Sequence, residues 1–448
     1  MPSPSLGINP RITIERMTAS IETARGGPLY DYLGGTPGED HLVGTNEDDT
    51  IEGFGGHDTL LGRGGNDNVS GGDGADFLRG DPGNDGLFGG DGDDYLRGGA
   101  GNDTMNGQGG FDRAAFFDSP VGVHVSLLIA APQDTGQGVD WLIEIDHLSG
   151  TLFDDKLIGD AGDNWLWGAN SAADPPTTAG ADTLLGDAGD DLLEIGTGNH
   201  RLIGGDGIDT VTLFGNFTGT FGGVTVDLNL QGAVQDTGQG LMFLKQVEQL
   251  SGSVHDDTLI GDIAANLLAG RDGDDTLSGG AGRDQLFGDG AIAIDAPQGT
   301  SGPIVELRQV IAGPASPAGA DVLFGGGGAD FLLGGFGADD QTGGAGADIF
   351  VFTTIEDSLP GSTDIVRDFT MHDQVDVKAI DADASTLANE DFHFVAAFTG
   401  AAAEALLQYN RTEDRTHLSL DVDGDAVADA KIVFEGFVST FYDWNGIV

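Results

Sequence analysis

A repeat of nine residues begins at Gly35 and constrains the fold more than any other feature of the chain. Nine consecutive units, from GTPGEDHLV to GQGGFDRAA, have glycine at position 1, aspartate at position 6 and an apolar residue at position 8. Position 4 is glycine in every unit except the second, where Glu47 stands. A flexible linker has no reason to keep position 8 apolar, so the repeat predicts ordered structure.

Each unit has room for one tight turn and one short strand. Glycine at positions 1 and 4 permits the left-handed backbone of such a turn. The last three residues suffice for a strand in which position 8 points inward and positions 7 and 9 point outward. Eighteen residues then complete one coil, and successive coils stack about 4.8 Å apart. We therefore predict an all-β parallel β-roll (β-helix solenoid) with Asp58 over Asp40 and Asp76 over Asp58.

Stacked carboxylates of this kind require cations. The chain has 60 Asp and 14 Glu against 18 Lys and Arg, and its net charge is −56. Aspartate favours turns whereas glutamate tolerates helix interiors, so the acidic residues are expected in the turns. Carboxylates about 4.8 Å apart cannot all remain ionised unless a cation lies between them. Carboxylate and carbonyl oxygens are hard ligands, which select Ca²⁺ over zinc or copper.

The same composition excludes several classes of protein. The negative charge argues against nucleic acid or an anionic membrane as partner, because both require a basic surface. The absence of cysteine excludes disulfides, thiolate zinc sites and a cysteine nucleophile. No apolar run at the start has the length of a signal peptide, and none elsewhere has that of a membrane span. We expect export by a route that reads another signal.

The nonapeptide resembles the repeats-in-toxin (RTX) motif, GGxGxDxUx with U apolar. In that family a parallel β-roll holds Ca²⁺ between turns n and n+2, through position-6 carboxylates and carbonyls of the glycine region. The resemblance implies several Ca²⁺ ions as cofactors. It assigns as carboxylate ligands Asp40, Asp49, Asp58, Asp67, Asp76, Asp85, Asp94, Asp103, Asp112, Asp182, Asp191, Asp209, Asp257, Asp275, Asp284, Asp321, Asp330, Asp339 and Asp348. It assigns as glycine-region ligands Gly53, Gly56, Gly62, Gly65, Gly71, Gly72, Gly74, Gly89, Gly90, Gly92, Gly325, Gly326, Gly328, Gly343, Gly344 and Gly346.

Three units in the later blocks depart from aspartate at position 6. They carry Asn164, His200 and Asn266 there. A neutral ligand replaces an anionic one at these places, so we expect weak calcium binding or none.

A longer duplication lies between the blocks of repeats. Gln133–Gly168 and Gln235–Gly270 agree at 19 of 36 positions at a constant offset of 102, and we predict that both form wider coils of the same solenoid. The Ala169–Ala179 and Ala291–Pro317 segments are rich in Pro, Ala and Gly and are expected to be loops. The predicted organisation is an N-terminal arm (1–34), RTX blocks (35–115, 177–212, 252–290 and 318–351), wide-coil insertions (116–176 and 213–251), a loop insertion (291–317) and a C-terminal cap (345–448).

From about Ala345 the sequence resembles the C-terminal domain of the serralysin metalloproteases. That family has a D-x-F-V-F strand followed by D-x-I-x-D-F and D-x-(V/I)-D-(V/L)-x-x-I-D. The matching residues are Asp348, Phe350, Phe352, Asp364, Ile365, Asp368, Phe369, Asp376 and Ile380. There the domain caps the roll and carries an uncleaved C-terminal secretion signal. The resemblance implies a secreted protein, extracellular or at the cell surface, with a type I secretion exporter as partner, although Asn445 and Gly446 interrupt the acidic-then-apolar ending in the tail FYDWNGIV.

A second acidic motif, DVDGDAVAD, spaces its carboxylates as a calcium loop does. Its glycine stands at position 4 rather than 6, and Ile432 occupies position 12, where a bidentate glutamate belongs. A weaker calcium site and a solvated hairpin turn both remain open for its four carboxylates, those of Asp421, Asp423, Asp425 and Asp429.

Sequence motifs of common hydrolases are absent. The nine histidines include no H-E-x-x-H pair, neither G-x-S-x-G nor S-x-x-K occurs, and no lysine follows a glycine as a P-loop requires. We predict a non-enzymatic, secreted calcium-binding protein with calcium-coupled folding and a structural or adhesive role at the cell surface or in the extracellular matrix.

Two alternatives remain open. One is an enzyme or accessory module acting on an extracellular polysaccharide, because RTX rolls also occur in alginate epimerases. Trp141, Trp165 and Trp167 would then stack on sugar rings rather than pack between coils. The other is a secretion and folding module for a separate catalytic chain. Cell-surface polysaccharide and a second copy of the chain are the candidate macromolecular partners.

Overall fold

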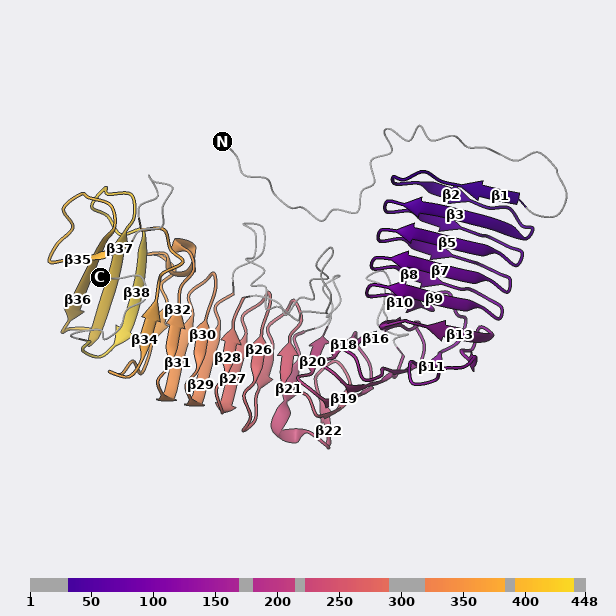
Figure 1. Cartoon of the computed structure of the whole chain (residues 1–448). Coiled ribbons are helices and arrows are strands. Elements are labelled where there is room, and N and C mark those ends of the chain that lie inside the picture. Colours follow the sequence, from indigo (N-terminus) through magenta and orange to yellow (C-terminus); the bar gives the residue numbers. More distant parts are fainter. Residues whose placement is uncertain (1–30, 169–179, 214–221, 290–318, 383–390, 439–448) are drawn as a thin grey trace.

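The chain forms a long β-solenoid in the computed structural model, shown in Figure 1. Helical structure in the described part of the chain is confined to two short 3₁₀ segments, η2 (Leu228–Leu230) and η3 (Ile355–Ser358). The direction in which the coils stack changes partway along the chain, so the solenoid is bent (Figure 1). The structure describes residues 31–168, 180–213, 222–289, 319–382 and 391–438.

One sheet of fifteen parallel strands forms a continuous wall along the solenoid. Each coil contributes one strand of a few residues to this wall. In spatial order the strands are β2 (His41–Val43), β4 (Thr59–Leu61), β6 (Phe77–Arg79), β8 (Tyr95–Arg97), β10 (Arg113–Ala115), β14 (His147–Ser149), β16 (Trp165–Trp167), β18 (Leu192–Ile195), β20 (Thr210–Leu213), β24 (Gln249–Ser251), β26 (Leu267–Ala269), β28 (Gln285–Phe287), β30 (Phe331–Leu333), β32 (Ile349–Val351) and β34 (Gln374–Asp376).

The opposite wall is divided into three successive sheets. The first contains β1 (Asp31–Gly34), β3 (Asp49–Gly55), β5 (Asn68–Asp73), β7 (Gly86–Asp91), β9 (Thr104–Gly109), β13 (Val139–Ile143) and β12 (Gln133–Asp134). The second contains β11 (His124–Ser126), β15 (Lys156–Ile158), β17 (Thr183–Ala188), β19 (His200–Asp206), β23 (Leu241–Lys245) and β22 (Val234–Asp236). The third contains β21 (Thr225–Asp227), β25 (Thr258–Ile260), β27 (Thr276–Ala281), β29 (Val322–Gly328), β31 (Asp340–Gly346), β33 (Ile365–Val366), β38 (Ala430–Glu435), β37 (Arg415–Asp421), β36 (Glu404–Asn410) and β35 (His393–Val395).

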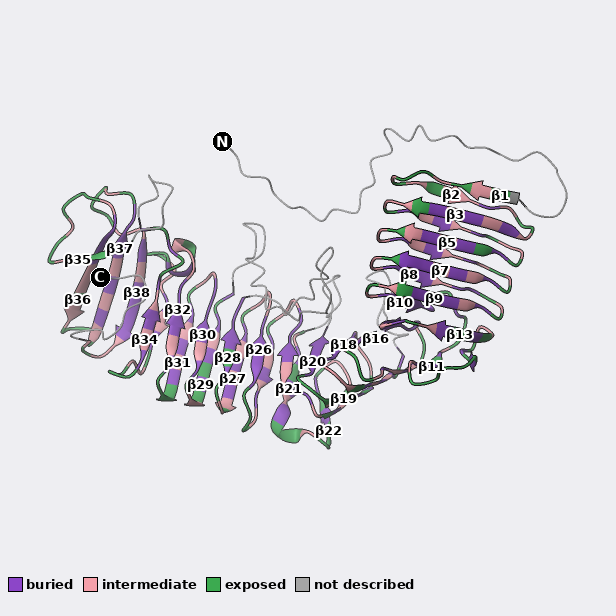
Figure 2. Cartoon of the chain, in the orientation of Figure 1, coloured by how far each residue is buried: buried purple, intermediate pink, exposed green. Residues whose placement is uncertain are grey.

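The strand register confirms the eighteen-residue coil. Leu42 pairs with Leu60, Leu60 with Leu78, and Leu78 with Leu96. In β4, β6 and β8, each of which starts after a position-6 aspartate, position 8 is buried while positions 7 and 9 are only partly covered (Figure 2). The buried position-8 side chains form one apolar column between the two walls, in which each coil packs on the next. In the first block its members are Ile51, Leu60, Val69, Leu78, Leu87, Leu96, Met105 and Ala114.

The duplicated segments lengthen their coils, and each also contains an antiparallel hairpin that the sequence pattern did not predict. Strands β12 and β13 pair antiparallel, as do β22 and β23. The motif QDTGQG forms the turn in both copies, where Gly136 and Gly238 have φ of 86° and 84°. Only glycine adopts this conformation without strain, which explains why one motif gives the same turn twice.

In the C-terminal part, the stacked coils end and an antiparallel meander follows. Strands β36, β37 and β38 pair antiparallel, and β38 joins the roll by pairing parallel with β33. Phe369 packs between Phe350 of the last coils and Phe434 of the meander, with ring centroids 6.1 and 5.1 Å away. The apolar column of the roll thus continues into the core of the meander.

Several sequence predictions lie outside the described residues. They are most of the N-terminal arm, the loops at 169–179 and 291–317, and the last residues of the proposed secretion signal.

The inward column predicts that substitutions of two adjacent leucines on β4 have very different effects on stability. Leu60 is fully buried and Leu61 faces outward on the same strand. We expect Leu60→Ala to lower the free energy of unfolding by about 2–5 kcal/mol, as for other buried leucines, and Leu61→Ala to lower it much less. Urea unfolding at saturating calcium measures both. Equal losses would contradict the assignment of position 8 to the core.

Candidate metal-binding turns

The position-6 aspartates form ladders along the two edges of the roll. The backbone N–H of Asp40 donates to Oδ1 of Asp58 over 2.7 Å, and the N–H of Asp58 donates to Oδ1 of Asp76 over 2.7 Å. The ladder that precedes the fifteen-stranded sheet begins Asp40, Asp58, Asp76, Asp94 and Asp112, and the opposite ladder begins Asp49, Asp67, Asp85 and Asp103. One oxygen of each carboxylate therefore ties its turn to the preceding coil.

The second oxygen of most rungs has no hydrogen-bond partner among the described residues, although it is buried. Leaving a buried charged oxygen unpaired is costly, so this oxygen requires a cation or a proton. The predicted ligands with a buried, unpartnered Oδ2 are Asp58, Asp67, Asp76, Asp85, Asp94, Asp103, Asp112, Asp182, Asp191, Asp209, Asp275, Asp284, Asp321, Asp330, Asp339 and Asp348.

Glycine at position 1 keeps the space beside this oxygen open. A Cβ added to Gly62 would collide with Oδ2 of Asp67 and would lie 3.0 Å from the carbonyl oxygen of Gly80, in the next coil. The carbonyls of Gly71, Gly89 and Gly343 border the equivalent spaces further along the roll. A carboxylate oxygen and a carbonyl oxygen from the neighbouring coil therefore face one small space, and both are ligand types that calcium prefers.

Glycines later in the turns bring a second layer of carbonyls together. Gly74 and Gly92 have φ of 130°, and a side chain on either would collide with the carbonyl one coil earlier. Of the other predicted glycine ligands, those with the same left-handed backbone are Gly56, Gly65, Gly72, Gly90, Gly326, Gly328 and Gly344, while Gly346 approaches the carbonyl of Gly328 in the same way. The turns thus present backbone oxygens at the spacing of the coils.

Burial shifts the carboxylates strongly toward the protonated form. Desolvation raises the pKa of Asp67 to about 6, of Asp85 to about 7 and of Asp94 to about 8, and neighbouring aspartates in the ladder add to the effect. Desolvation also raises the pKa of Asp321 to about 10. These carboxylates stay charged in the folded chain only with a compensating cation.

Where position 2 is threonine or serine, the position-6 carboxylate of the same unit has a different hydrogen-bond partner. The backbone N–H of Thr45 donates to Oδ2 of Asp49 over 2.6 Å, and that of Ser253 donates to Oδ2 of Asp257 over 2.5 Å. Thr36 makes the same bond to Asp40. These units lie at the starts of ladders, where a preceding coil of the same sheet is missing or atypical. The local hydrogen bond satisfies Oδ2, the oxygen that stays unpartnered in later units.

The side-chain amides of the two asparagines at position 6 have hydrogen-bond partners within the roll. Nδ2 of Asn164 donates to the carbonyl of Asp146 over 2.9 Å, and Nδ2 of Asn266 donates to the carbonyl of Glu248 over 3.0 Å. The amide supplies the donor that a carboxylate lacks, and weak or absent calcium binding at these turns remains a prediction. His200 is also buried; its Nδ1 lies 3.3 Å from Oδ2 of Asp182.

The ladders include six acidic residues that the sequence did not assign as metal ligands. Backbone N–H groups of the preceding coil donate to Asp140, Asp146, Asp155, Glu248, Asp364 and Asp373. Asp155 had a clear signal, because it matches Asp257 at the offset of 102 and also follows a Gly-Thr turn. The others follow coils of irregular length, where counting in nines loses the register.

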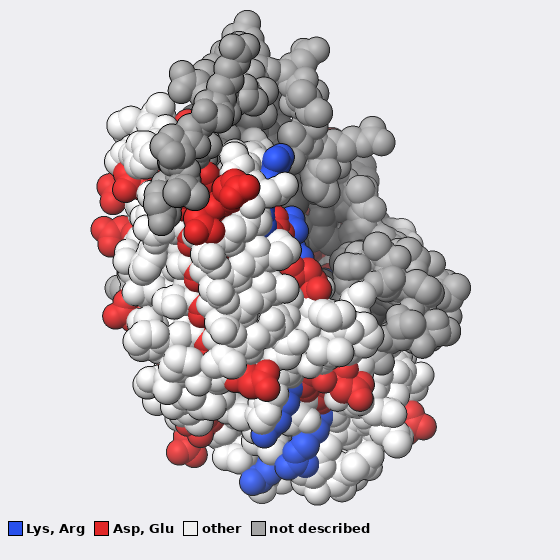
Figure 3. Space-filling model, turned by 90° about the vertical axis from the view of Figure 1, so that its right-hand side faces the viewer, with Lys and Arg blue, Asp and Glu red and all other residues white. Residues whose placement is uncertain are grey.

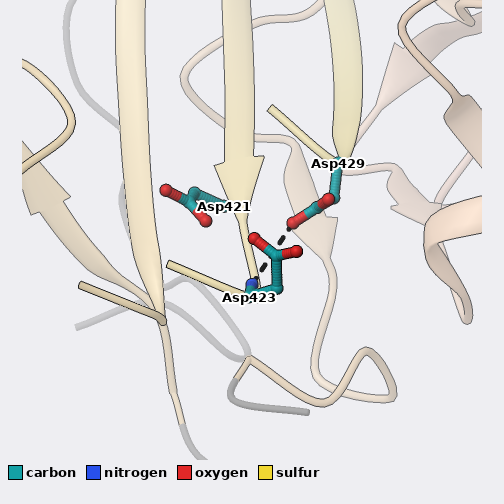
Figure 4. A group of neighbouring side chains, drawn as sticks. All are labelled: Asp421, Asp423 and Asp429. Carbon is teal, nitrogen blue, oxygen red and sulfur yellow. Dashed lines mark hydrogen bonds between the residues drawn. The ribbon is translucent and has the colours of Figure 1, made fainter. Parts of the chain in front are cut away.

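The Asp421–Asp429 motif forms the turn between antiparallel β37 and β38 (Figure 4). One carboxylate oxygen from each of Asp421, Asp423 and Asp429 lies within 4.8 Å of the others. The Asp421 carboxylate accepts N–H bonds from Gly424 (2.7 Å) and Ala426 (3.0 Å), while that of Asp429 accepts from Val422 (2.7 Å). Asp425 likewise accepts from Val427. These hydrogen bonds hold the hairpin turn, and a calcium site at its carboxylates remains a prediction.

The tryptophans of the first duplicated segment differ in exposure. Trp141 is 41% exposed, whereas Arg113 covers the Trp165 ring at 3.6 Å and the Trp165 indole donates to Glu194 over 2.9 Å. Trp167 packs edge-on against Phe117. Trp165 and Trp167 therefore pack against neighbouring coils, as one of the two sequence alternatives proposed.

Comparison with known families connects this geometry to calcium. The RTX calcium-binding nonapeptide repeat matches in four copies, at residues 34–69, 53–87, 61–96 and 87–114. The repeats of this family are calcium-binding motifs, so calcium is a cofactor of the chain. No family of protease domains matches.

Individual relatives match parts of the chain. Metalloprotease AprA of Pseudomonas entomophila (strain L48) is 43% identical over 88 residues, which are 19% of this chain and 18% of that protein. The R2 subunit of the AlgE6 mannuronan C5-epimerase of Azotobacter vinelandii matches with 21% identity and a TM-score of 0.21, covering 41% of this chain and 86% of the subunit. Its R3 subunit matches with 23% identity and a TM-score of 0.17, covering 39% of this chain and 73% of the subunit.

The C-terminal two-thirds carry the broadest match. The family described as peptidase M10 serralysin C terminal covers residues 149–444, so it includes the later repeats as well as the meander. Domains of this kind together with RTX repeats are typical of proteins secreted by type I systems. No helix in the described residues is long and apolar enough to span a membrane. The match extends over more than half of the sequence, and the chain therefore belongs to the peptidase M10 serralysin C-terminal family.

Proposed function

We propose that this protein is an extracellular calcium-binding protein whose roll folds as calcium binds, with a structural or adhesive role and no catalytic activity of its own. The observation that carries the proposal is the series of buried carboxylate oxygens without a hydrogen-bond partner among the described residues. They recur once per turn, at the position that the RTX family uses for calcium.

The ion-holding residues follow from the same observation. The Oδ2 atoms of Asp58, Asp76 and Asp94 and their counterparts would hold the ions, together with carbonyls such as those of Gly71 and Gly89. Calcium would supply the positive charge that desolvated carboxylates require. Asp40, Asp49 and Asp257 already use one oxygen on a local N–H bond, and they would contribute less.

Coupling between calcium and folding follows from the small core. Each unit of the roll buries one apolar side chain, which is too little to offset the entropy lost by ordering nine residues. Extracellular calcium modules have Kd values of roughly 10⁻⁴–10⁻³ M, so cytosolic calcium would leave the sites empty. Calcium at about tenfold above Kd would stabilise the fold by about 1.4 kcal/mol per site. The chain would then stay unfolded during export and fold outside the cell.

The first test concerns one rung. Asp76 links to both neighbouring rungs, since its carboxylate accepts the N–H of Asp58 and its own N–H donates to Asp94. We expect Asp76→Ala to raise the calcium midpoint of folding several-fold, measured by far-UV circular dichroism. Asp73→Ala makes the same change of charge in the same turn but at an exposed side chain, and should shift the midpoint less than about twofold. A folded spectrum in chelator, or equal shifts in both variants, would show the mechanism to be wrong.

The second test concerns pH. The pKa of Asp94 rises to about 8 in the folded chain without metal, from an unfolded value near 4, so this folded state binds extra protons between these limits. Its stability therefore falls as pH rises through this range. The unfolded chain has already ionised these carboxylates above about pH 5, so protons and calcium compete only for the folded roll. Protons therefore replace part of the calcium that folding requires, and the calcium midpoint of folding should fall as pH is lowered from about 8 to about 5. Calcium titrations followed by far-UV circular dichroism at several pH values measure this midpoint, and a midpoint independent of pH would contradict the proposal.

The third test concerns export. Residues 391–448 contain the meander and the end that resembles a type I secretion signal. Deleting them should retain the protein inside cells that carry a matching type I exporter, as measured by immunoblotting of medium and cells. Deleting residues 1–30 instead should leave secretion intact. Undiminished secretion of the chain lacking 391–448 would refute a C-terminal signal.

A further inference from the structure

The outer face of the six-stranded sheet differs from the rest of this acidic protein. Strand pairing aligns Lys156, Thr183, Arg201 and Phe243 in one row across β15, β17, β19 and β23. The row beside it ends at Lys245. The intervening residues Leu157, Leu184, Leu202 and Leu244 are fully buried, so alternation along the strands turns both rows outward. We call these two rows the basic face.

The three cations of the basic face are not matched by nearby acids in the described part of the chain. Other arginines in the described part of the chain form ion pairs, such as Arg97 with Asp118 at 2.9 Å. No described carboxylate lies within 4.0 Å of the charged groups of Lys156, Arg201 or Lys245, and neither row contains an acidic residue. On the side of the molecule drawn in Figure 3, basic side chains are few and form a narrow, broken band, with acidic side chains beside it. Such unpaired charge on a chain of net charge −56 points to an anionic ligand.

A pocket lies at the basic face. Its volume is about 310 Å³, and it is lined by Ala181, Asp182, Thr183, Asn199, His200, Arg201, Val234, Leu241 and Phe243, of which Asp182 and His200 are buried. The guanidinium of Arg201 stacks over the Phe243 ring at 4.2 Å, which fixes its plane and leaves its N–H edge free to bind a carboxylate or sulfate.

Apolar side chains form the rim of the pocket. Val234 and Leu241 are 63% and 49% exposed and lie on the antiparallel hairpin of β22 and β23. The pocket therefore combines cations, amide and hydroxyl groups, and apolar surface. The hydroxyls, carboxylates and C–H faces of an acidic sugar require this combination, whereas a nucleic acid requires many phosphate contacts and a net positive surface.

We propose that the basic face binds an anionic polysaccharide. The chain would run across the strands, so that Lys156 and Arg201, two strands apart, contact acidic groups about 10 Å from each other. Arg201 would hold a carboxylate in the pocket, and Lys245 on the adjacent row would contact the next acidic group. This proposal requires the folded roll but does not depend on which aspartates hold calcium.

The test uses short oligogalacturonates, whose binding is measured by calorimetry at saturating calcium on protein shown by circular dichroism to be folded. Arg201→Gln combined with Lys245→Gln should weaken binding by about tenfold or more. The control combines Arg63→Gln with Arg411→Gln, which removes two exposed charges elsewhere and should change affinity less than about twofold. Binding should also weaken as ionic strength rises from about 0.05 to 0.5 M.

Several outcomes would overturn the proposal. If the Arg201/Lys245 variant binds as tightly as the unsubstituted protein, calcium bridges between the acidic turns and the sugar account for the binding. Equal affinity for neutral dextran fragments would exclude recognition of charge, and equal affinity for polyglutamate would exclude recognition of sugar. Should the double substitution alter the calcium midpoint, Lys156→Gln tests the same face on another strand and must weaken binding. Failure of these tests leaves the calcium titrations unaffected, so the two proposals fail separately.

Discussion

The fold depends on carboxylates that are buried with one oxygen unpartnered in the described structure. Their other oxygen accepts a backbone N–H from the preceding coil, so the same side chain both fixes the register and creates a need for positive charge. Neither half of this arrangement works alone. Without the hydrogen bond the coils would lose their alignment, and without a cation the ladder would repel itself or take up protons.

The apolar core of the roll is small and regular, and it leaves the fold dependent on the cations at the carboxylates. One side chain per unit fills a single column, and the fifteen-stranded sheet lets every coil pack on the next without interruption. The opposite wall is instead divided into three sheets. The meander at the C-terminus ends the stack, because its β38 pairs with β33 and its phenylalanines extend the column into a core that does not rely on repeated turns.

Departures from the repeat carry structural information of their own. Thr45 and Ser253 close local turns near the starts of ladders, and Asn164 and Asn266 supply amide donors where the coil lengthens. Each replaces an interaction that would otherwise require an ion. Asn164 follows β15 of the six-stranded sheet, whose outer face is the one with unpaired cations.

The sequence alone determined the coil, its register, the inward column and the identity of most rungs, because a fixed period ties each residue to a place in space. It also identified calcium, since the RTX pattern is specific. The tertiary structure determined the features that do not follow from a fixed repeat length. Asp146 and Glu248 became rungs only because longer coils bring them back into line, and the hairpins of the duplicated segments depend on contacts across the sheet. The basic face likewise appears only after folding, because Lys156, Arg201 and Lys245 are far apart in sequence and are brought together by strand pairing.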